Sequence, residues 1–142
     1  MTNREQADRL ISEAGDIREE LSRLLSRGVW NLVVRRAQEV IELALKALMI
    51  EMGVDYPKTH DVAPLFARTV RARGAAVDEP TLTWLQQASA RLARARGPAF
   101  YLETDFTDRD AKDAAGDADR VMTFARDFLK KLRGGAPDHP VP

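Results

Sequence analysis

VVRRAQEVIELALKALMIEM, residues 33–52, is the stretch that decides how the rest of this sequence must fold. Its apolar side chains recur at steps of three and four residues, which is the period of an α-helix. A helix that is apolar on two faces needs neighbours on both, so we expect a helix over about residues 29–52 in the middle of a helical bundle. The two apolar lines are Val33, Ala37, Val40, Ala44 and Ala47, and Ile41, Leu45, Leu48 and Met52.

The remaining face of this helix is charged. Arg35–Glu39 and Glu42–Lys46 each stand four residues apart, so they can pair along one side of the helix, for about 0.2–0.5 kcal/mol each where exposed. Two settings stay open for Glu42 and Lys46. They form either an exposed surface pair, or a pair that faces the bundle interior or a dimer seam, where each charge needs its partner.

Helical periodicity also covers the segments on either side. Residues 10–24 carry apolar side chains at helical steps, and Gly28 marks the end of that helix. After the central helix, Gly53 suits the left-handed C-terminal position and Pro57 prevents continuation.

A shorter helix follows within residues 59–74. Thr59 or Asp61 can cap it, and Pro64 is tolerated in its first turn. Its apolar face is Val62, Leu65, Phe66 and Val70.

Two further long helices complete the pattern. One begins at residues 78–80, Asp-Glu-Pro, and we expect Gly97-Pro98 to stop it. The other begins at Thr107 or Asp108, where Thr107 and Asp110 have the spacing of a capping box. The apolar line of the last helix is Ala111, Ala115, Ala118, Val121 or Met122, Ala125, Phe128 and Leu132.

No useful stretch shows the alternation of a β-strand, so the predicted fold is all-α. We expect an antiparallel up-and-down bundle of four long helices plus one short helix. A single domain should cover residues 1–133, and the Gly/Pro-rich residues 134–142 should form a disordered C-terminal tail.

Composition narrows the class of protein. There is no cysteine, so a disulfide, a thiolate nucleophile and a Cys-ligated zinc are excluded. No apolar run approaches the roughly 20 residues of a membrane span, and the charged first residues lack the apolar core of a secretory signal. We therefore expect a cytoplasmic protein without membrane contact, metal or cofactor.

The net charge is zero, which argues against a protein whose whole surface grips nucleic acid. Between residues 68 and 101, however, six arginines stand against Asp78 and Glu79, a local charge of +4 by subtraction. These arginines are either solvated on helix faces and ends, or form a patch that faces a polyanion. They are Arg68, Arg71, Arg73, Arg91, Arg94 and Arg96.

Conventional catalytic signatures are mostly absent, and only two histidines exist. His139 falls in the predicted tail. His60 opens the short helix and has no second histidine or cysteine nearby to complete a metal site. Its ordinary role would be a hydrogen bond at a helix N-terminus or packing on a neighbouring helix. Trp30 and Trp84 are read as core or interface aromatics, with ligand stacking as the alternative.

Residues 35–66, RRAQEVIELALKALMIEMGVDYPKTHDVAPLF, resemble the HEPN family. In that family a central helix reads Q-x-x-x-E-x-A-L-K-A-L, and a loop then ends in a Thr-His-Asp/Asn step that opens the next helix. The matching positions here are Gln38, Glu42, residues 44–48 and Thr59-His60-Asp61. The resemblance extends to an Arg-Gly-Pro…Tyr segment, residues 96–101, and to a closing Ala-rich helix, and it covers about residues 5–132.

The resemblance implies an all-α bundle that commonly dimerises and is often encoded beside a minimal nucleotidyltransferase. Many HEPN proteins are metal-independent ribonucleases whose site is an arginine followed, four to six residues later, by a histidine near the start of the last helix. The histidine moves a proton at the ribose 2′-OH or the leaving oxygen, and the arginine holds the phosphate.

This sequence departs from that pattern at the histidine. Arg96 is followed after four residues by Tyr101, and Arg94 after six by the same tyrosine. Tyrosine has an ordinary pKa of about 10, so it is a poor general base at pH 7. It can still donate a hydrogen bond to a phosphate or act as an acid.

Three functions remain open. The first, which we favour, is a noncatalytic accessory protein, a homodimer that binds a nucleotide, RNA or a nucleotidyltransferase-type partner in a toxin–antitoxin-like module. The second is a metal-independent endoribonuclease toxin that uses Arg96 and Tyr101, and the third is a structural scaffold. For the first, the ligand-facing candidates are Arg94, Arg96 and Tyr101, followed by His60, Glu42 and Lys46.

Overall fold

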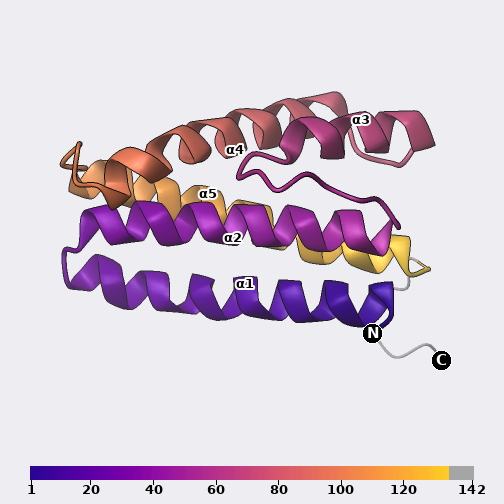
Figure 1. Ribbon diagram of the computed structural model, residues 1–142, viewed down its shortest axis with the longest axis horizontal. Helices are drawn as coiled ribbons and strands as arrows, with labels where there is room; N and C mark the ends of the chain where they lie inside the picture. Colours follow the sequence, from indigo (N-terminus) through magenta and orange to yellow (C-terminus); the bar gives the residue numbers. More distant parts are fainter. Residues whose placement is uncertain (135–142) are drawn as a thin grey trace.

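The computed structural model describes residues 1–134, which fold into five α-helices. Four long helices lie side by side with alternating direction, and the short third helix lies over them beside the fourth (Figure 1). The predicted all-α bundle of four long helices and one short helix is confirmed. The helices are α1 (Asn3–Ser26), α2 (Trp30–Glu51), α3 (Ala63–Arg73), α4 (Glu79–Phe100) and α5 (Asp108–Leu132).

The predicted tail lies outside the described residues from residue 135 onward, and His139 lies outside them too. None of the helices within residues 1–134 combines the length and the apolar character that a membrane crossing requires.

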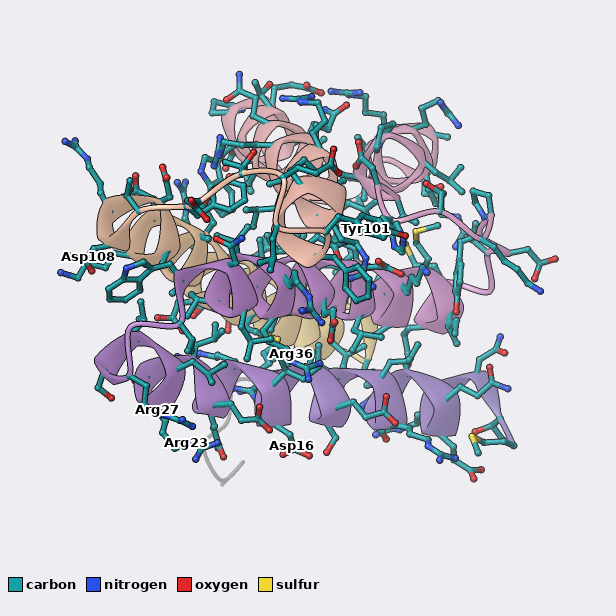
Figure 2. All side chains as sticks on the ribbon, turned by 60° about the vertical axis from the view of Figure 1, so that its left-hand side comes forward. Asp16, Arg23, Arg27, Arg36, Tyr101 and Asp108 are labelled. Atoms are coloured by element: carbon teal, nitrogen blue, oxygen red, sulfur yellow. The ribbon has the colours of Figure 1, made fainter. Side chains whose placement is uncertain are left out.

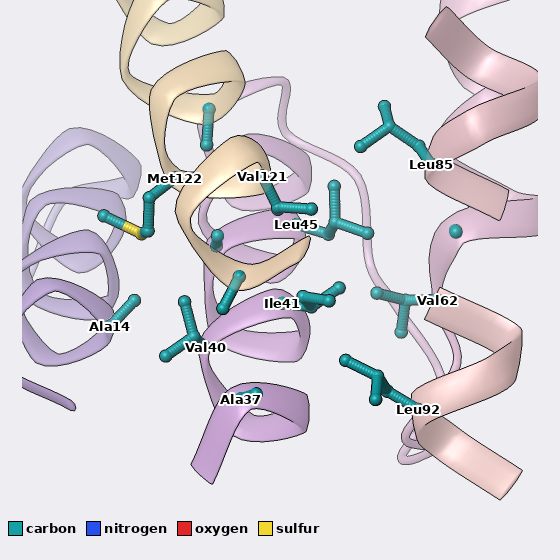
Figure 3. Close-up of a cluster of buried hydrophobic side chains, with 14 of the residues drawn as sticks. Ala14, Ala37, Val40, Ile41, Leu45, Val62, Leu85, Leu92, Val121 and Met122 are labelled. Carbon is teal, nitrogen blue, oxygen red and sulfur yellow. The ribbon is translucent and has the colours of Figure 1, made fainter. Parts of the chain in front are cut away.

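Helix α2 occupies the centre of the bundle, as its two apolar lines predict. It packs against α1, α3, α4 and α5. Both lines are buried except for Met52 at the C-terminal end, which is half-buried. Figure 3 shows Ile41 and Leu45 of α2 among side chains of the neighbouring helices, including Leu85 of α4 and Val121 of α5.

Several predicted helix ends are confirmed. Gly28 and Gly53 both have a φ of +72°, a conformation that glycine adopts without the steric cost of a Cβ atom. The Thr107–Asp110 capping box is complete at the start of α5. In the apolar line of α5 the last member was wrong, because Leu132 is exposed while Leu129 is buried.

The predicted cap of α3 was also wrong. The helix begins at Ala63, with Val62 in the cap position and no capping side chain. The Asp61 carboxylate instead accepts a hydrogen bond of 2.7 Å from the Ser89 hydroxyl of α4, and the Thr59 hydroxyl accepts one of 3.3 Å from the Asp61 N–H. The Asp61 side chain therefore attaches the segment before α3 to α4. Only Pro64 keeps its predicted place in the first turn.

Helix α4 does not stop at Gly97-Pro98 but continues to Phe100. Pro98 lies in the last turn, so its missing N–H removes only a bond near the end of the helix. The chain then turns at Leu102, whose φ is +56°, and the Glu103 N–H donates to the Pro98 carbonyl at 2.9 Å. This is the bond of a Schellman ending, with leucine where glycine is usual.

Candidate functional site

A pocket of about 330 Å³ opens at the C-terminal end of α4, beside the segment that leads into α3. Arg96, Tyr101 and Phe100 border it from the end of α4, and His60 borders it from the α2–α3 connection. Tyr101, at the end of the helix, is 71% exposed (Figure 2). The structure therefore brings three of the predicted site residues, His60, Arg96 and Tyr101, to one place.

Contacts with α2 hold the side chain of Arg96. Its Nη1 donates to Oε1 of Gln38 at 2.7 Å and lies 3.7 Å from a carboxylate oxygen of Glu39. Glu39 also takes a hydrogen bond of 2.9 Å from Arg36. Gln38 is only 1% exposed, so its amide is a fixed anchor inside the bundle. The guanidinium of Arg96 is thus positioned before any ligand arrives.

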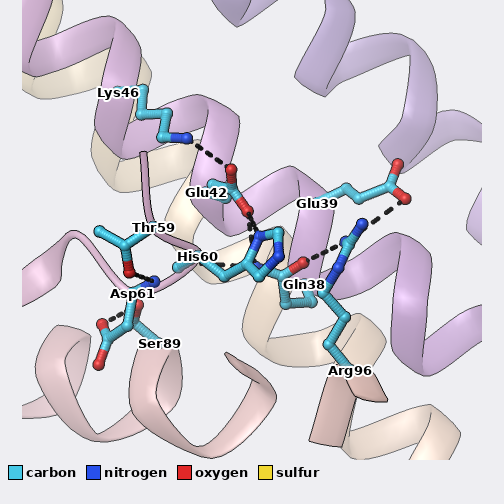
Figure 4. A network of polar contacts seen from close by, with 9 residues as sticks. All are labelled: Gln38, Glu39, Glu42, Lys46, Thr59, His60, Asp61, Ser89 and Arg96. Carbon is cyan, nitrogen blue, oxygen red and sulfur yellow. Dashed lines mark hydrogen bonds and ion pairs between the residues drawn. The ribbon is translucent and has the colours of Figure 1, made fainter. Parts of the chain in front are cut away.

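His60 is held by the same helix through Glu42. The Nδ1 atom of His60 lies 2.7 Å from Oε1 of Glu42, and Lys46 donates to Oε2 at 2.6 Å (Figure 4). The Gln38 Nε2 donates to Glu42 at 3.0 Å and to the backbone carbonyl of His60 at 3.3 Å. Because its amide oxygen binds Arg96, Gln38 joins the two halves of the site into one network.

Glu42 and Lys46 are therefore neither a plain surface pair nor an isolated buried pair. Their side chains are 15% and 13% exposed, respectively. Partial burial pushes the pKa of Glu42 upward, but the hydrogen bonds from Gln38, Lys46 and His60 together bring that pKa below its ordinary value. The carboxylate is consequently ionised at neutral pH.

The domain model of the HEPN family matches residues 7–128. The chain belongs to the HEPN family. Among solved structures, it is similar to that of ST0689, described as an archaeal HEPN homologue, with a TM-score of 0.68 and 20% sequence identity over 88% of this chain and 98% of that one. At this identity the likeness establishes the fold alone. No curated protein matches the chain.

In this HEPN domain, Arg94 does not join Arg96. It lies exposed on another side of α4, beside a shallow hollow that also includes Gln86 and Arg91. Nor do the other arginines of the basic stretch form one free patch. Arg71 pairs with Glu79, Arg91 pairs with Asp117, and Arg73 donates to the Met52 carbonyl. Much of the local positive charge is therefore used in contacts within the domain.

The Arg35–Glu39 pair predicted from the sequence was wrong. Arg35 lies over the ring of Phe100, 4.7 Å from its centroid, while Glu39 binds Arg36 and approaches Arg96. A cation over an aromatic face is favourable, and the contact is available only because the end of α4 crosses the start of α2.

The two tryptophans are half-buried against the core, as expected of packing aromatics. Arg120 covers the ring of Trp84 at 3.9 Å, so that face has a partner within the domain. Within residues 1–134, no group of three or more His, Asp or Glu side chains is placed to hold a metal ion.

Sequence reasoning missed Gln38 and Phe100 as parts of the site. The signal for Gln38 was present: it is an amide on a mostly apolar helix, four residues before Glu42, and such a residue must find partners when buried. Nothing in the sequence around Phe100 indicated that it would remain exposed.

Proposed function

We propose that this HEPN domain is a noncatalytic binding protein that holds a phosphate-bearing ligand, a nucleotide or single-stranded RNA, in the pocket at the end of α4. The observation that carries the proposal is the meeting of Arg96 and His60 at one pocket whose rim is aromatic. An arginine fork and an imidazole recognise phosphate oxygens, while exposed aromatic rings stack on unpaired bases.

The rim supports the choice of a nucleotide over a bare anion. Phe100 and Tyr101 pack edge to face, with ring centroids 5.0 Å apart, and both remain largely exposed. Base stacking on such rings contributes about 1–3 kcal/mol per base. A base on this rim would keep its phosphate within the same small region as Arg96.

The resemblance to the family supports the wider setting of the proposal. We propose that the domain forms a homodimer and belongs to a toxin–antitoxin-like or nucleotidyltransferase-linked module, in which a nucleotidyltransferase-type protein is its partner. Co-expression with the neighbouring gene product, followed by co-purification and size measurement, tests this setting. A monomer that never associates with that product would contradict it.

Ribonuclease activity is the second candidate, and one observation favours it. His60 shares a pocket with Arg96, so a proton-transfer group stands near the position where the family resemblance places histidine and this chain has tyrosine. We rank binding first because the expected catalytic position holds Tyr101 in place of the histidine that the family resemblance implies.

Arg96→Ala and Arg94→Ala are the matched pair that tests phosphate binding, since both remove an arginine from α4 but only Arg96 borders the pocket. We expect Arg96→Ala to weaken binding of AMP and of a 5′-phosphorylated single-stranded RNA by about tenfold or more, and Arg94→Ala by less than about twofold. Calorimetry and fluorescence anisotropy at low salt measure both.

Equal losses in the two variants would contradict a specific pocket and point to diffuse charge attraction. Incubating the same RNA with the protein in the presence of a chelator tests the second candidate. If the wild-type protein cleaves the RNA and both His60→Ala and Arg96→Ala lose this cleavage, the domain is a ribonuclease and the binding proposal is contradicted.

A further inference from the structure

We infer that His60 is the second phosphate-binding group of this pocket, and that it acts with one proton shared between its Nε2 atom and the ligand, so that the pocket selects a phosphate monoester over a diester. The inference rests on the proposed function, since it concerns the same pocket. It adds the protonation state of the site and the class of phosphate that fits it.

The first step concerns the proton on Nδ1. Nδ1 of His60 lies 2.7 Å from Oε1 of Glu42, and Glu42 is ionised because its hydrogen bonds outweigh the cost of burial. An ionised carboxylate only accepts hydrogen bonds. Nδ1 must therefore carry a proton whenever this contact is present, and Glu42 determines which tautomer the ring adopts.

The second step concerns Nε2. When the ring is neutral and Nδ1 holds the proton, Nε2 presents a bare lone pair. Within residues 1–134 this nitrogen has no hydrogen-bond partner, and the side chain is 54% exposed at the edge of the pocket. A phosphate oxygen also presents lone pairs, so the two would repel each other. Contact requires a further proton, either on Nε2 or on the phosphate.

The third step is the balance of charge around the ring. On α2, the nearest charged group to His60 is Glu42, which binds Lys46, and Glu39 lies one turn earlier on the same helix. On α4, Arg96 and Tyr101 border the same pocket as His60. In its own segment, Lys58 is exposed and Asp61 binds Ser89.

The ion-paired groups largely cancel. Arg96 is the cation that lines the pocket, and Arg35 lies beside it, over the ring of Phe100. The network of Arg36, Arg96, Lys46, Glu39 and Glu42 has three cations and two carboxylates. It therefore has one positive charge in excess, and a protonated His60 adds a second. A phosphate monoester carries close to two negative charges near neutral pH, with its second pKa at about 6, whereas a diester carries one. The more negative monoester therefore suits this positive pocket better than a diester does, and it can also share a proton with Nε2.

The pH dependence of AMP binding tests this inference, with adenosine and the diester ApA as comparison ligands. We expect AMP affinity to peak near the second pKa of the monoester, about 6. On the alkaline side, where neither the ring nor the phosphate supplies the shared proton, the affinity should fall by about tenfold per pH unit. It should fall again on the acid side as the monoester becomes singly charged. ApA should bind more weakly and lack the acid limb, and adenosine should bind more weakly than both.

Three variants identify the group that causes AMP affinity to fall at alkaline pH. Circular dichroism and thermal unfolding first confirm that each variant is folded. His60→Gln should flatten the limb and bind AMP at pH 6 about as weakly as wild type does at pH 8. Glu42→Gln can donate or accept at Nδ1, so a neutral ring can place its proton on Nε2, and the limb should become shallow. Arg94→Ala, outside the pocket, should keep the wild-type profile.

Several outcomes of these measurements, on the wild type and the variants, would overturn all or part of the inference. If AMP binding depends on Arg96 and yet does not change with pH, or if the wild-type pH profile of AMP affinity persists in His60→Gln, then His60 does not bind the phosphate. Either result would leave the proposed function intact. If AMP affinity still fell steeply with rising pH in Glu42→Gln, Glu42 would not set the tautomer of His60. Equal affinity for ApA and AMP would contradict the preference for monoesters. No binding of AMP or RNA at any pH would overturn both proposals.

Discussion

At the scale of single residues, Glu42 is where the polar contacts between α2 and the α2–α3 connection converge. One carboxylate receives hydrogen bonds from Gln38 and Lys46 on its own helix and contacts His60 from the connection. A half-buried carboxylate is costly unless it is paired, and here the partners outweigh that cost, because the pKa of Glu42 is lowered.

Glu42→Gln should lower the free energy of unfolding at pH 7 by about 1–3 kcal/mol. The folded pKa of Glu42 lies below its ordinary value of 4.5. Its stabilising contribution is therefore present above pH 4.5 and is lost as the pH falls through the lower, folded pKa. Urea unfolding of both proteins from pH 7 to pH 3 should show the difference between them narrowing below pH 4.5.

Glu79→Gln is the control for this measurement. The hydrogen bond from Arg71 lowers the pKa of Glu79 as well, but that pair is exposed, so salt screens it and little stability should be lost. If both variants lost the same free energy of unfolding, the Glu42 network would contribute no more to stability than an exposed ion pair does.

At the scale of elements, Asn31 joins the start of α2 to the α4–α5 connection. Its Nδ2 donates to the carbonyls of Ala99, at 3.3 Å, and Thr104, at 2.8 Å, and its Oδ1 accepts from the Phe106 N–H at 2.9 Å. These bonds hold both ends of the segment that carries Tyr101. The rim of the pocket thus depends on a side chain outside it.

Asn31→Ala should destabilise the domain by about 1–3 kcal/mol, because three backbone groups lose their partner. Hydrogen exchange measured by NMR should accelerate at the Phe106 amide, and AMP binding should weaken as Tyr101 becomes less ordered. Thr107→Ala is the matched control. It removes only the cap of α5, for about 1 kcal/mol, and should accelerate exchange at Asp110 instead. Unchanged exchange at Phe106 in Asn31→Ala would contradict the role of Asn31.

At the scale of the whole molecule, Arg133 connects α1, α2 and α5 at the end of the bundle opposite the pocket. Following α5, it approaches Asp8 of α1 at 2.7 Å and Glu51 of α2 at 2.8 Å, and it donates to the Arg4 carbonyl at 3.3 Å. Its side chain is 17% exposed, so water screens these contacts only partly. The hydrogen bond to Glu51 is the main cause of the raised pKa of Arg133.

Arg133→Met keeps much of the apolar stem and removes the charge. We expect it to lower the free energy of unfolding by about 1–3 kcal/mol and the thermal midpoint by several degrees, measured by circular dichroism. Arg27→Met, an exposed arginine at the other end of α1, should change either value very little. AMP affinity should be unaffected in both variants, since neither position touches the pocket; a loss of binding in Arg133→Met would mean that the two ends of the bundle are coupled.

The sequence by itself determined the helices, their order and the central place of α2. Those features follow from local periodicity and from caps such as Thr107 with Asp110, which act within a few residues of the chain. The pairing of polar side chains was different. Asp61 binds Ser89 rather than capping α3, and Arg35 covers Phe100 rather than pairing with Glu39.

Only the tertiary structure decided the site. Arg96 and Tyr101 are close in the sequence, but His60 precedes them by more than thirty residues and reaches the same pocket because the α2–α3 connection runs back along α2 to Glu42. The reason is physical. The period of a helix is written in consecutive residues, whereas a hydrogen bond or ion pair depends on which distant groups packing places within about 3 Å.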